Sequence, residues 1–232
     1  MTENIIIVVM GGSAISLIPI IVENSYNLIG YTDDYGDKNT PDLIINKNGA
    51  EQRIEVKYLE KNDKLPEIKE KYNCNNAVIG VGGVGNRSSI ELKKKLSAML
   101  KEQGFNTPAL ISKAAHINAH NVEIGEGTFV MPGAIVQSGA RIGKNCLLNT
   151  GAQVDHECKL GDYVHIAPGA VLCGRVNVDE GAHVGANSVV RESLTINAYA
   201  IVGIGAVVVK NLESSSENQK TYIGNPAREL KK

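Results

Sequence analysis

Aliphatic residues recur at every sixth position in the second half of the chain, from Ile124 to Val208. Each position of that series is Ile, Val or Leu, and the distance from first to last (208 − 124 = 84) is fourteen steps of six without a slip of register. An α-helix repeats its apolar face every ~3.6 residues and a strand every ~2, so neither explains this spacing. A hexapeptide repeat is typical of a parallel β-helix, in which three short strands and three turns make one coil. The fifteen aliphatic positions therefore predict five coils.

Small residues form a second regularity, because they occupy the fifth place of nearly every block and let the chain turn its corners. These residues are Thr128, Ala134, Ala140, Cys146, Ala152, Cys158, Val164, Ala170, Ala182, Ser188, Ala200 and Ala206. Glycine and asparagine in the second and fourth places suit turns with a positive φ. The residues concerned are Gly125, Gly127, Gly133, Gly143, Asn145, Gly151 and Gly161.

The first half of the chain alternates between apolar runs and amphipathic stretches. The runs predict strands at 4–10, 28–32, 77–81 and 107–111, with weaker strand signals at 43–45 and 54–58. The amphipathic stretches predict helices at 15–24, 64–72 and 88–103. Alternation of this kind indicates a small parallel α/β domain. We expect this domain over residues 1–112 and the β-helix over 113–232, with the C-terminal tail covering the last coil.

Glycine- or aspartate-rich turns follow three of the predicted strands, at 11–14, 33–34 and 82–86. Ligands of parallel α/β sheets bind beyond the carboxyl ends of the strands, where these turns lie. The first turn lacks the full GxGxxG spacing, and no convincing ribose-binding acid follows it about twenty residues on. Asp33 and Asp34 either contact a sugar or cap a turn, and the sequence leaves both readings open.

Charge and cysteine content indicate which partners and which cellular compartment to expect. Lys and Arg total 24 and Asp and Glu total 25, which gives no indication of a nucleic-acid or anionic-membrane partner. No apolar stretch approaches the ~20 residues of a membrane span, and no basic segment precedes the first apolar run. The four cysteines show no metal-type spacing, and Cys146 and Cys158 occupy the small corner position. We expect a soluble cytoplasmic protein.

Two histidines interrupt the repeat, His156 and His165. His156 stands between Asp155 and Glu157, and a histidine beside a carboxylate can act as a general base near neutral pH. The spacing leaves open which acid faces the ring, and a solvated surface histidine is the plainer alternative. A metal site would draw on His156, His165, Asp155, Glu157 and Asp162, but their spacing matches no known site, so no metal is expected.

The whole chain resembles the bacterial family of sugar N- and O-acetyltransferases. The resemblance lies in the hexapeptide run, the DHE segment around His156, the histidine nine residues later, the closing GNPA and the α/β domain in front. It implies a Rossmann-like α/β N-terminal domain followed by a left-handed parallel β-helix. It also implies acetyl-CoA as co-substrate and a homotrimer with composite sites between subunits.

The same resemblance implies the roles of individual residues. His156 corresponds to the catalytic base, Glu157 raises its basicity, and Gly174 supplies a backbone N–H near the thioester oxygen. Acetyl-CoA contacts are implied for His165, Ala186 and Ile204. Contacts to the sugar nucleotide are implied for Gly12, Ser13, Ala14, Asp33, Asp34, Gly80, Gly82 and Arg87.

The expected reaction is direct transfer of acetyl from acetyl-CoA to the 4-amino group of a UDP- or dTDP-linked amino-dideoxy sugar. The sequence departs from the family at Ser13 and Ala14, where a histidine usually stands, and residues 80–87 are closer to the sialic-acid branch. O-acetylation of sialic acid or a related sugar is therefore the alternative. A non-catalytic β-helix scaffold and a metal-dependent hydratase are more distant alternatives.

Overall fold

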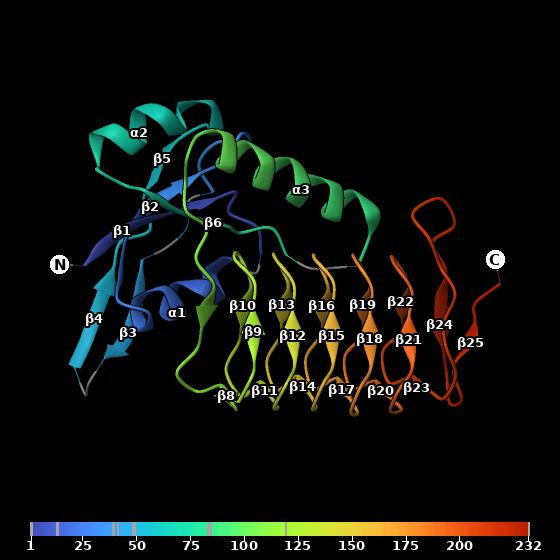
Figure 1. The fold of residues 1–232 in the computed structure, drawn as a ribbon. Helices are drawn as coiled ribbons and strands as arrows, with labels where there is room; N and C mark the ends of the chain where they lie inside the picture. Colours follow the sequence, from blue (N-terminus) through green and yellow to red (C-terminus); the bar gives the residue numbers. More distant parts are fainter. Residues whose placement is uncertain are drawn as a thin grey trace. The chain divides into compact units, whose positions relative to one another are not determined.

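The computed structural model describes residues 2–12, 14–38, 40, 42–47, 50–82, 85–118 and 120–231. The chain forms two compact units, which are described separately (Figure 1). The first unit comprises Met1–Gly82 and Leu92–Pro108, and the second comprises Gly83–Glu91 and Ala109–Lys232.

A four-stranded parallel sheet forms the centre of the first unit, in the order β5-β2-β1-β6. The strands are β1 (Glu3–Val8), β2 (Tyr26–Thr32), β5 (Tyr58–Glu60) and β6 (Asn76–Ile79). Strand β1 lies between β2 and β6, and Ile5, Ile6, Ile7 and Val8 are all completely buried. An inner parallel strand has no solvent face, which explains the continuous apolar run at the start of the chain.

Helical segments connect these strands, and one follows β6. They are η1 (Ala14–Ser16), α1 (Leu17–Glu23), η2 (Asn62–Lys64), α2 (Leu65–Lys71) and α3 (Arg87–Glu102). Pro19 falls in the first turn of α1, where a missing backbone N–H costs no helical hydrogen bond. Gly104 follows α3 with a φ of +70°, the left-handed conformation that ends many helices. The parallel α/β prediction is confirmed.

The strand expected at residues 54–58 is wrong. Strand β4 (Ala50–Ile54) ends where the prediction begins, and it forms an antiparallel hairpin with β3 (Leu43–Lys47). Strand β5 begins only at Tyr58 and pairs with β2. Residues 55–57 carry the chain from one sheet to the other, and the Lys57 carbonyl accepts a hydrogen bond from the Tyr31 N–H of β2 at 2.8 Å.

The second unit is a parallel β-helix, whose strands stack into three faces (Figure 1). The first face holds β7 (Leu110–Ile111), β10 (Phe129–Val130), β13 (Leu147–Leu148), β16 (His165–Ile166), β19 (His183–Val184), β22 (Ile201–Val202), β24 (Thr221–Ile223) and β25 (Arg228–Glu229). The second face holds β8 (His116–Ile117), β11 (Ile135–Val136), β14 (Gln153–Val154), β17 (Val171–Leu172), β20 (Val189–Val190) and β23 (Val207–Val208). The third face holds β9 (Glu123–Ile124), β12 (Arg141–Ile142), β15 (Lys159–Leu160), β18 (Asn177–Val178) and β21 (Thr195–Ile196).

The strand at Leu110–Ile111, which we expected to be the last strand of the α/β sheet, belongs to the β-helix instead. It pairs in parallel with Phe129–Val130, and the second face has six strands, so there is one coil more than the five expected. The hexapeptide spacing conceals this coil because the step from Ile117 to Ile124 is seven residues (124 − 117 = 7). The extra residue breaks the register before the regular run begins.

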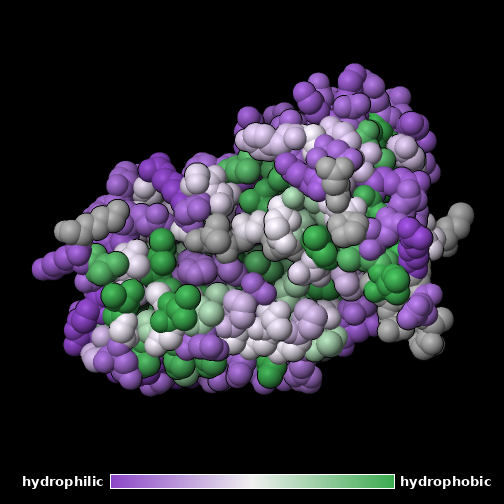
Figure 2. Space-filling view, turned by 180° about the vertical axis from the view of Figure 1, so that it is seen from behind, coloured by the Kyte–Doolittle hydropathy of each residue, from purple (hydrophilic) through white to green (hydrophobic). Residues whose placement is uncertain are grey.

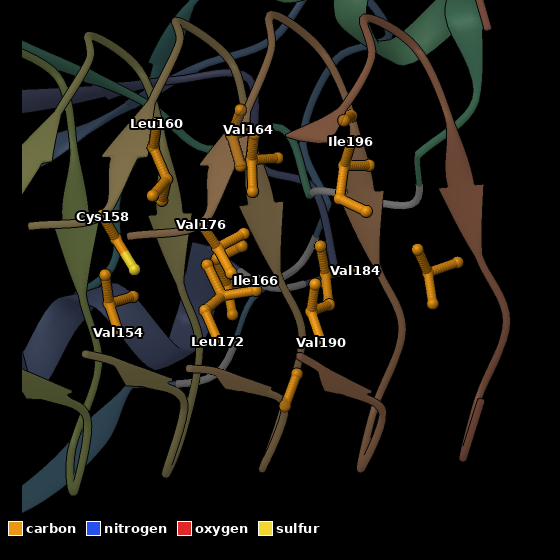
Figure 3. Close-up of a cluster of buried hydrophobic side chains, with 14 of the residues drawn as sticks. Val154, Cys158, Leu160, Val164, Ile166, Leu172, Val176, Val184, Val190 and Ile196 are labelled. Atoms are coloured by element: carbon orange, nitrogen blue, oxygen red, sulfur yellow. The ribbon is translucent and has the colours of Figure 1, made fainter. Parts of the chain in front are cut away.

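Outward-facing positions carry mainly polar side chains with apolar ones interspersed (Figure 2), whereas the interior is apolar (Figure 3). The aliphatic positions from Val130 to Val208 are buried, and so are the small residues of the fifth place. Burial raises the pKa of the Cys158 thiol to about 11, which agrees with a packing role for this residue. The interpretation of the repeat is confirmed.

The turn conformations differ from the expectation in one respect. The fourth residue of each block from Ile124 to the block of Val202 has a positive φ, including Gly127, Gly133, Asn145 and Gly151, and also non-glycine residues such as Glu157. The second-place glycines Gly125, Gly143 and Gly161 do not have a positive φ. A Cβ on Gly125 or on Gly143 would lie 2.6 Å from backbone atoms of the next coil. Close stacking of coils, and not backbone conformation, requires glycine in the second place.

The C-terminal tail closes the end of the β-helix. Strand β24 pairs in parallel with β22, and β25 folds back on β24 in antiparallel orientation. Tyr222 and Ala227 are buried against the last coil, and the Tyr222 hydroxyl donates to the carbonyl of Glu213 at 2.7 Å. The tail therefore covers the open core, as terminal units of repeat folds do.

Candidate active site

His156 lies in the turn that joins β14 of the second face to β15 of the third face. Its backbone N–H donates to Asp155 Oδ1 at 2.6 Å, and the next N–H, of Glu157, donates to the carbonyl of Ser138 at 2.9 Å. Glu157 has a φ of +57°, an unfavourable conformation for this residue type. These hydrogen bonds, together with the one that the Arg175 N–H donates to the His156 carbonyl at 2.8 Å, fix the turn and leave the His156 side chain 47% exposed.

Glu157 is the acid that faces the imidazole. Its Oε2 lies 3.6 Å from His156 Nδ1, whereas Asp155 is engaged with the backbone. The sequence left this choice open, and the geometry resolves it. A carboxylate at Nδ1 orients the ring and stabilises the cation that forms when Nε2 takes up a proton.

The His156 ring lies against Gly174 on the next coil. A Cβ on residue 174 would overlap His156 Nε2 and would lie 2.5 Å from Cε1, so only glycine fits beneath this ring. Within the described part of the chain, no group accepts a hydrogen bond from the Gly174 N–H. A histidine nitrogen and an available backbone donor therefore occur together, as acyl transfer requires.

The residues with implied acetyl-CoA contacts lie elsewhere on the β-helix. Ala186 and Ile204 occupy turns between the first and second faces, so their edge is not the edge of His156 and Gly174. Ile204 is 81% exposed. In one chain, Ala186 and Ile204 thus lie on one edge of the second face, and His156 and Gly174 lie on the other edge.

His165 lies on the first face and is 7% exposed. Its Nδ1 is 3.0 Å from Nδ1 of His183 on the next strand, and its Nε2 is 3.3 Å from the Asn149 amide nitrogen. The two imidazole rings are tilted by 56° with their centroids 4.8 Å apart, and burial lowers the pKa of His183. The sequence analysis assigned no role to His183. The 18-residue spacing (183 − 165 = 18) nevertheless places both histidines on one ladder.

The acidic pair of the first unit stabilises turns at the carboxyl ends of strands. Asp33 is 1% exposed and accepts hydrogen bonds from the N–H of Met10 at 3.1 Å and of Tyr35 at 2.9 Å. Asp34 accepts from the N–H of Asn62 at 3.0 Å. Both carboxylates therefore hold the backbone of this region in place, as expected if Asp33 and Asp34 cap turns.

The first and third turns of this unit approach each other closely. A Cβ on Gly11 would lie 2.6 Å from the carbonyl oxygen of Gly80, and one on Gly80 would lie 2.9 Å from the buried Ala14. Gly12 is free of such contacts. Ser13 lies outside the described residues, as do positions 83 and 84 beyond Gly82. Arg87 is exposed at the start of α3.

Among the described residues, no group of three or more His, Cys, Asp or Glu side chains is arranged to hold a metal ion. Asp162, one of the candidate ligands, accepts a hydrogen bond from the N–H of Lys144 at 2.7 Å. In the same part of the chain, every helix is too short or too polar to cross a bilayer.

Comparisons with known proteins identify the repeat and the fold. The family model described as bacterial transferase hexapeptide (six repeats) matches residues 121–156 and 139–174. A comparison with curated protein sequences gives no match.

Solved structures resemble the chain over its full length. One is GDP-perosamine N-acetyltransferase from Caulobacter crescentus, a histidine variant in complex with CoA and GDP-perosamine. It has a TM-score of 0.84 and 26% identity, over 100% of this chain and 99% of that one. The acetyltransferase domain of PglB from Neisseria gonorrhoeae FA1090 has a TM-score of 0.79 and 26% identity, over 98% of this chain and 100% of that one. WeeI from Acinetobacter baumannii AYE has a TM-score of 0.77 and 27% identity, over 99% and 100%. The chain therefore contains a bacterial transferase hexapeptide repeat and is similar over its full length to bacterial acetyltransferases, one of which acts on GDP-perosamine.

Proposed function

We propose that the protein transfers acetyl from acetyl-CoA to an amino group of a nucleotide-linked amino sugar, with His156 as general base. The observation that carries this proposal is the arrangement of His156 Nδ1 at 3.6 Å from Glu157 and of its Nε2 face against Gly174. The Caulobacter crescentus protein, similar over its full length, was crystallised with CoA and GDP-perosamine. The PglB domain was crystallised with acetyl coenzyme A.

The chemistry is a direct transfer. The acceptor nitrogen attacks the thioester carbonyl carbon, and His156 Nε2 takes a proton from that nitrogen as the N–C bond forms. The Gly174 N–H donates to the carbonyl oxygen as negative charge develops there, a contribution that can reach ~3 kcal/mol. The C–S bond then breaks, CoA leaves as the thiol after receiving the proton from His156, and the product is an amide.

A second copy of the chain completes the site in this proposal. Ala186 and Ile204 lie on a different edge from His156 and Gly174, so a groove between two copies can bring the two edges together. The second face between these edges has apolar outward residues, namely Ile135, Val171, Val189 and Val207. A stripe of this kind favours contact with another protein surface, and a homotrimer supplies three equivalent grooves.

The first unit is the proposed sugar-nucleotide site, at the carboxyl ends of β1, β2 and β6. The approach of Gly11 to Gly80 and the hydrogen bonds of Asp33 and Asp34 hold the turns there in place. UDP, dTDP and GDP are all candidate nucleotides. Because acetyl-CoA and nucleotide sugars are cytoplasmic metabolites, we place the reaction in the cytoplasm.

Thiol release from acetyl-CoA, measured against a panel of acceptors, tests the proposal. The panel contains UDP-, dTDP- and GDP-linked 4-amino-4,6-dideoxy sugars, with free and CMP-linked sialic acid. Turnover on an amino sugar supports N-acetylation and identifies the nucleotide. Turnover on sialic acid alone overturns it in favour of O-acetylation, which the 80–87 segment suggested.

A further inference from the structure

The segment that begins α3 packs on the β-helix. Residues Gly83–Glu91 belong to the second unit, although the chain on both sides of them belongs to the first. Gly85 lies against His183, since a Cβ on Gly85 would lie 2.5 Å from the Cβ of His183 and 2.6 Å from its Cγ. Ile90 is buried, and its Cδ1 lies 3.2 Å from the place that a Cβ on Gly181 would take. The described part of this segment therefore contacts the first face of the β-helix and the turn that precedes it.

One side chain of the C-terminal tail, that of Gln219, completes this attachment. Its amide nitrogen donates to the carbonyl of Gly85 and to the carbonyl of Tyr199, both at 3.0 Å. A side-chain amide has two N–H donors, so both are used. Gly85 is buried, and a buried carbonyl without a partner is destabilising. The hydrogen bond from Gln219 therefore stabilises the position of the segment.

The backbone on both sides of Gln219 is held by hydrogen bonds. The carbonyl of the next residue, Lys220, accepts a hydrogen bond from the Ile201 N–H of β22 at 2.9 Å. The N–H of the preceding residue, Asn218, donates to Ser215 Oγ at 3.1 Å. The amide of Gln219 thus extends from a fixed part of the tail.

The attached segment leads directly to Arg87, for which the family resemblance implies a contact to the sugar nucleotide. Arg87 is exposed in the first turn of α3, which contains no acidic residue, so this end of the helix keeps its positive character. Asn86 caps the helix, because its Oδ1 accepts a hydrogen bond from the Ser89 N–H at 2.8 Å. Only this cap residue separates Gly85 from Arg87, so a shift of Gly85 moves Arg87 as well.

We propose that Gln219 is a positioning residue for acceptor binding. It holds the turn at Gly85, and thereby Arg87, while it touches neither substrate itself. The C-terminal tail then has two roles, because it covers the core of the β-helix and also fixes a turn of the acceptor site. This inference rests on the proposed function, since it takes the nucleotide-linked sugar as the ligand of that turn.

Steady-state kinetics of Gln219→Met test the proposal, because methionine has a similar length and lacks both donors. We expect KM for the best acceptor of the panel to rise about tenfold, with kcat changed less than twofold and KM for acetyl-CoA unchanged. Asn218→Met is the matched control, because Asn218 is exposed and, within the described part of the chain, its side chain forms no hydrogen bond. An unchanged KM for the acceptor overturns the inference. An equal rise in both KM values with a lower Tm also overturns it, because Gln219 would then only stabilise the fold.

Hydrogen exchange of the free protein separates this inference from the proposed reaction. In Gln219→Met, the amides of residues 86–90 are expected to exchange about tenfold faster than in the wild type, while those of β13 and β14 keep their rates. Unchanged exchange over residues 86–90 overturns the inference, because Gln219 would then not hold the turn.

Calorimetric titration with UDP, dTDP and GDP tests the link to the acceptor without turnover. The nucleotide that binds the wild type is expected to bind Gln219→Met about tenfold more weakly and Asn218→Met equally well. Equal affinity of the wild type and Gln219→Met, or no binding by either, overturns the inference. If the nucleotide binds as expected but no acceptor of the panel is acetylated, the proposed function fails and this inference stands.

Discussion

The imidazole of His156 lies directly against the Cα of Gly174, one coil further along the β-helix. Residues 18 positions apart stack in this fold, so the two residues are neighbours although they are distant in sequence. The contact leaves no room for a side chain at 174, and the position therefore determines where the His156 ring can lie.

Gly174→Ala is expected to displace the ring and lower kcat by about tenfold to a hundredfold, because misplacing a catalytic group by ~1 Å can cost this much. Since His156 is half exposed and can rotate outward, the Tm should change little. A double-variant cycle with His156→Ala checks whether Gly174→Ala acts by displacing the His156 ring. Gly174→Ala should have almost no further effect on kcat once the ring is absent, and an additive effect would contradict the account.

Glu157→Asn is expected to increase stability and decrease activity. Glu157 has a φ of +57°, a conformation that asparagine adopts more readily, so the free energy of unfolding should rise by about 0.5–1 kcal/mol. The carboxylate at His156 Nδ1 is lost at the same time, and kcat should fall. Denaturant unfolding and kcat, measured on the same preparation, check both effects.

Ser193→Asn is the matched control for that variant. Ser193 has a φ of +59° and accepts a hydrogen bond from Arg175, which the asparagine oxygen can also accept. We expect a similar gain in stability with kcat retained. Loss of activity in both variants would indicate that the added stability of these turns, and not the loss of the Glu157 carboxylate, lowers kcat.

Much of the fold follows from the sequence because the hexapeptide repeat directly reflects a coil with three sides. The repeat did not reveal the first coil, since the seven-residue step before Ile124 breaks its register. It also gave no reason to pair His165 with His183, because a period of six describes turns and only a period of 18 describes stacking.

Part of the candidate site could also be predicted from the sequence. His156 and Glu157 are adjacent in sequence, so their pairing could be anticipated. The role of Asp33 as a buried turn cap depends on the N–H groups of Met10 and Tyr35, whose positions only the folded chain defines.

The histidine pair, in which His165 is buried and His183 is partly buried, should make stability depend on pH. Burial lowers the pKa of His183 below its usual 6.5, so the unfolded chain binds the proton more readily than the folded chain does. The stabilising contribution is therefore complete above pH ~6.5 and is lost as the pH falls through the lowered folded-state pKa. His183→Gln should reduce the fall in Tm between pH 7.5 and pH 5.5. An unchanged pH dependence would show that His183 does not contribute to it.

Assembly of the proposed trimer should depend on the second face. Val189 faces outward on β20 and is 38% exposed in the single chain. Val189→Arg places a charge in the proposed interface, and light scattering should then report monomers with much reduced turnover. Thr195→Arg on the third face is the control and should remain trimeric. A wild-type protein that is monomeric at working concentration would contradict the composite site.

The central claim is that His156 drives formation of an amide on a nucleotide-linked amino sugar. Mass spectrometry of the product, from wild type and from His156→Ala with the best acceptor of the panel, tests it most directly. We expect an acetylated product that resists alkaline hydroxylamine, formed ~10²–10⁴ times more slowly by His156→Ala at an unchanged Tm. A product that hydroxylamine cleaves would be an ester, and undiminished turnover in His156→Ala would remove this histidine from the mechanism.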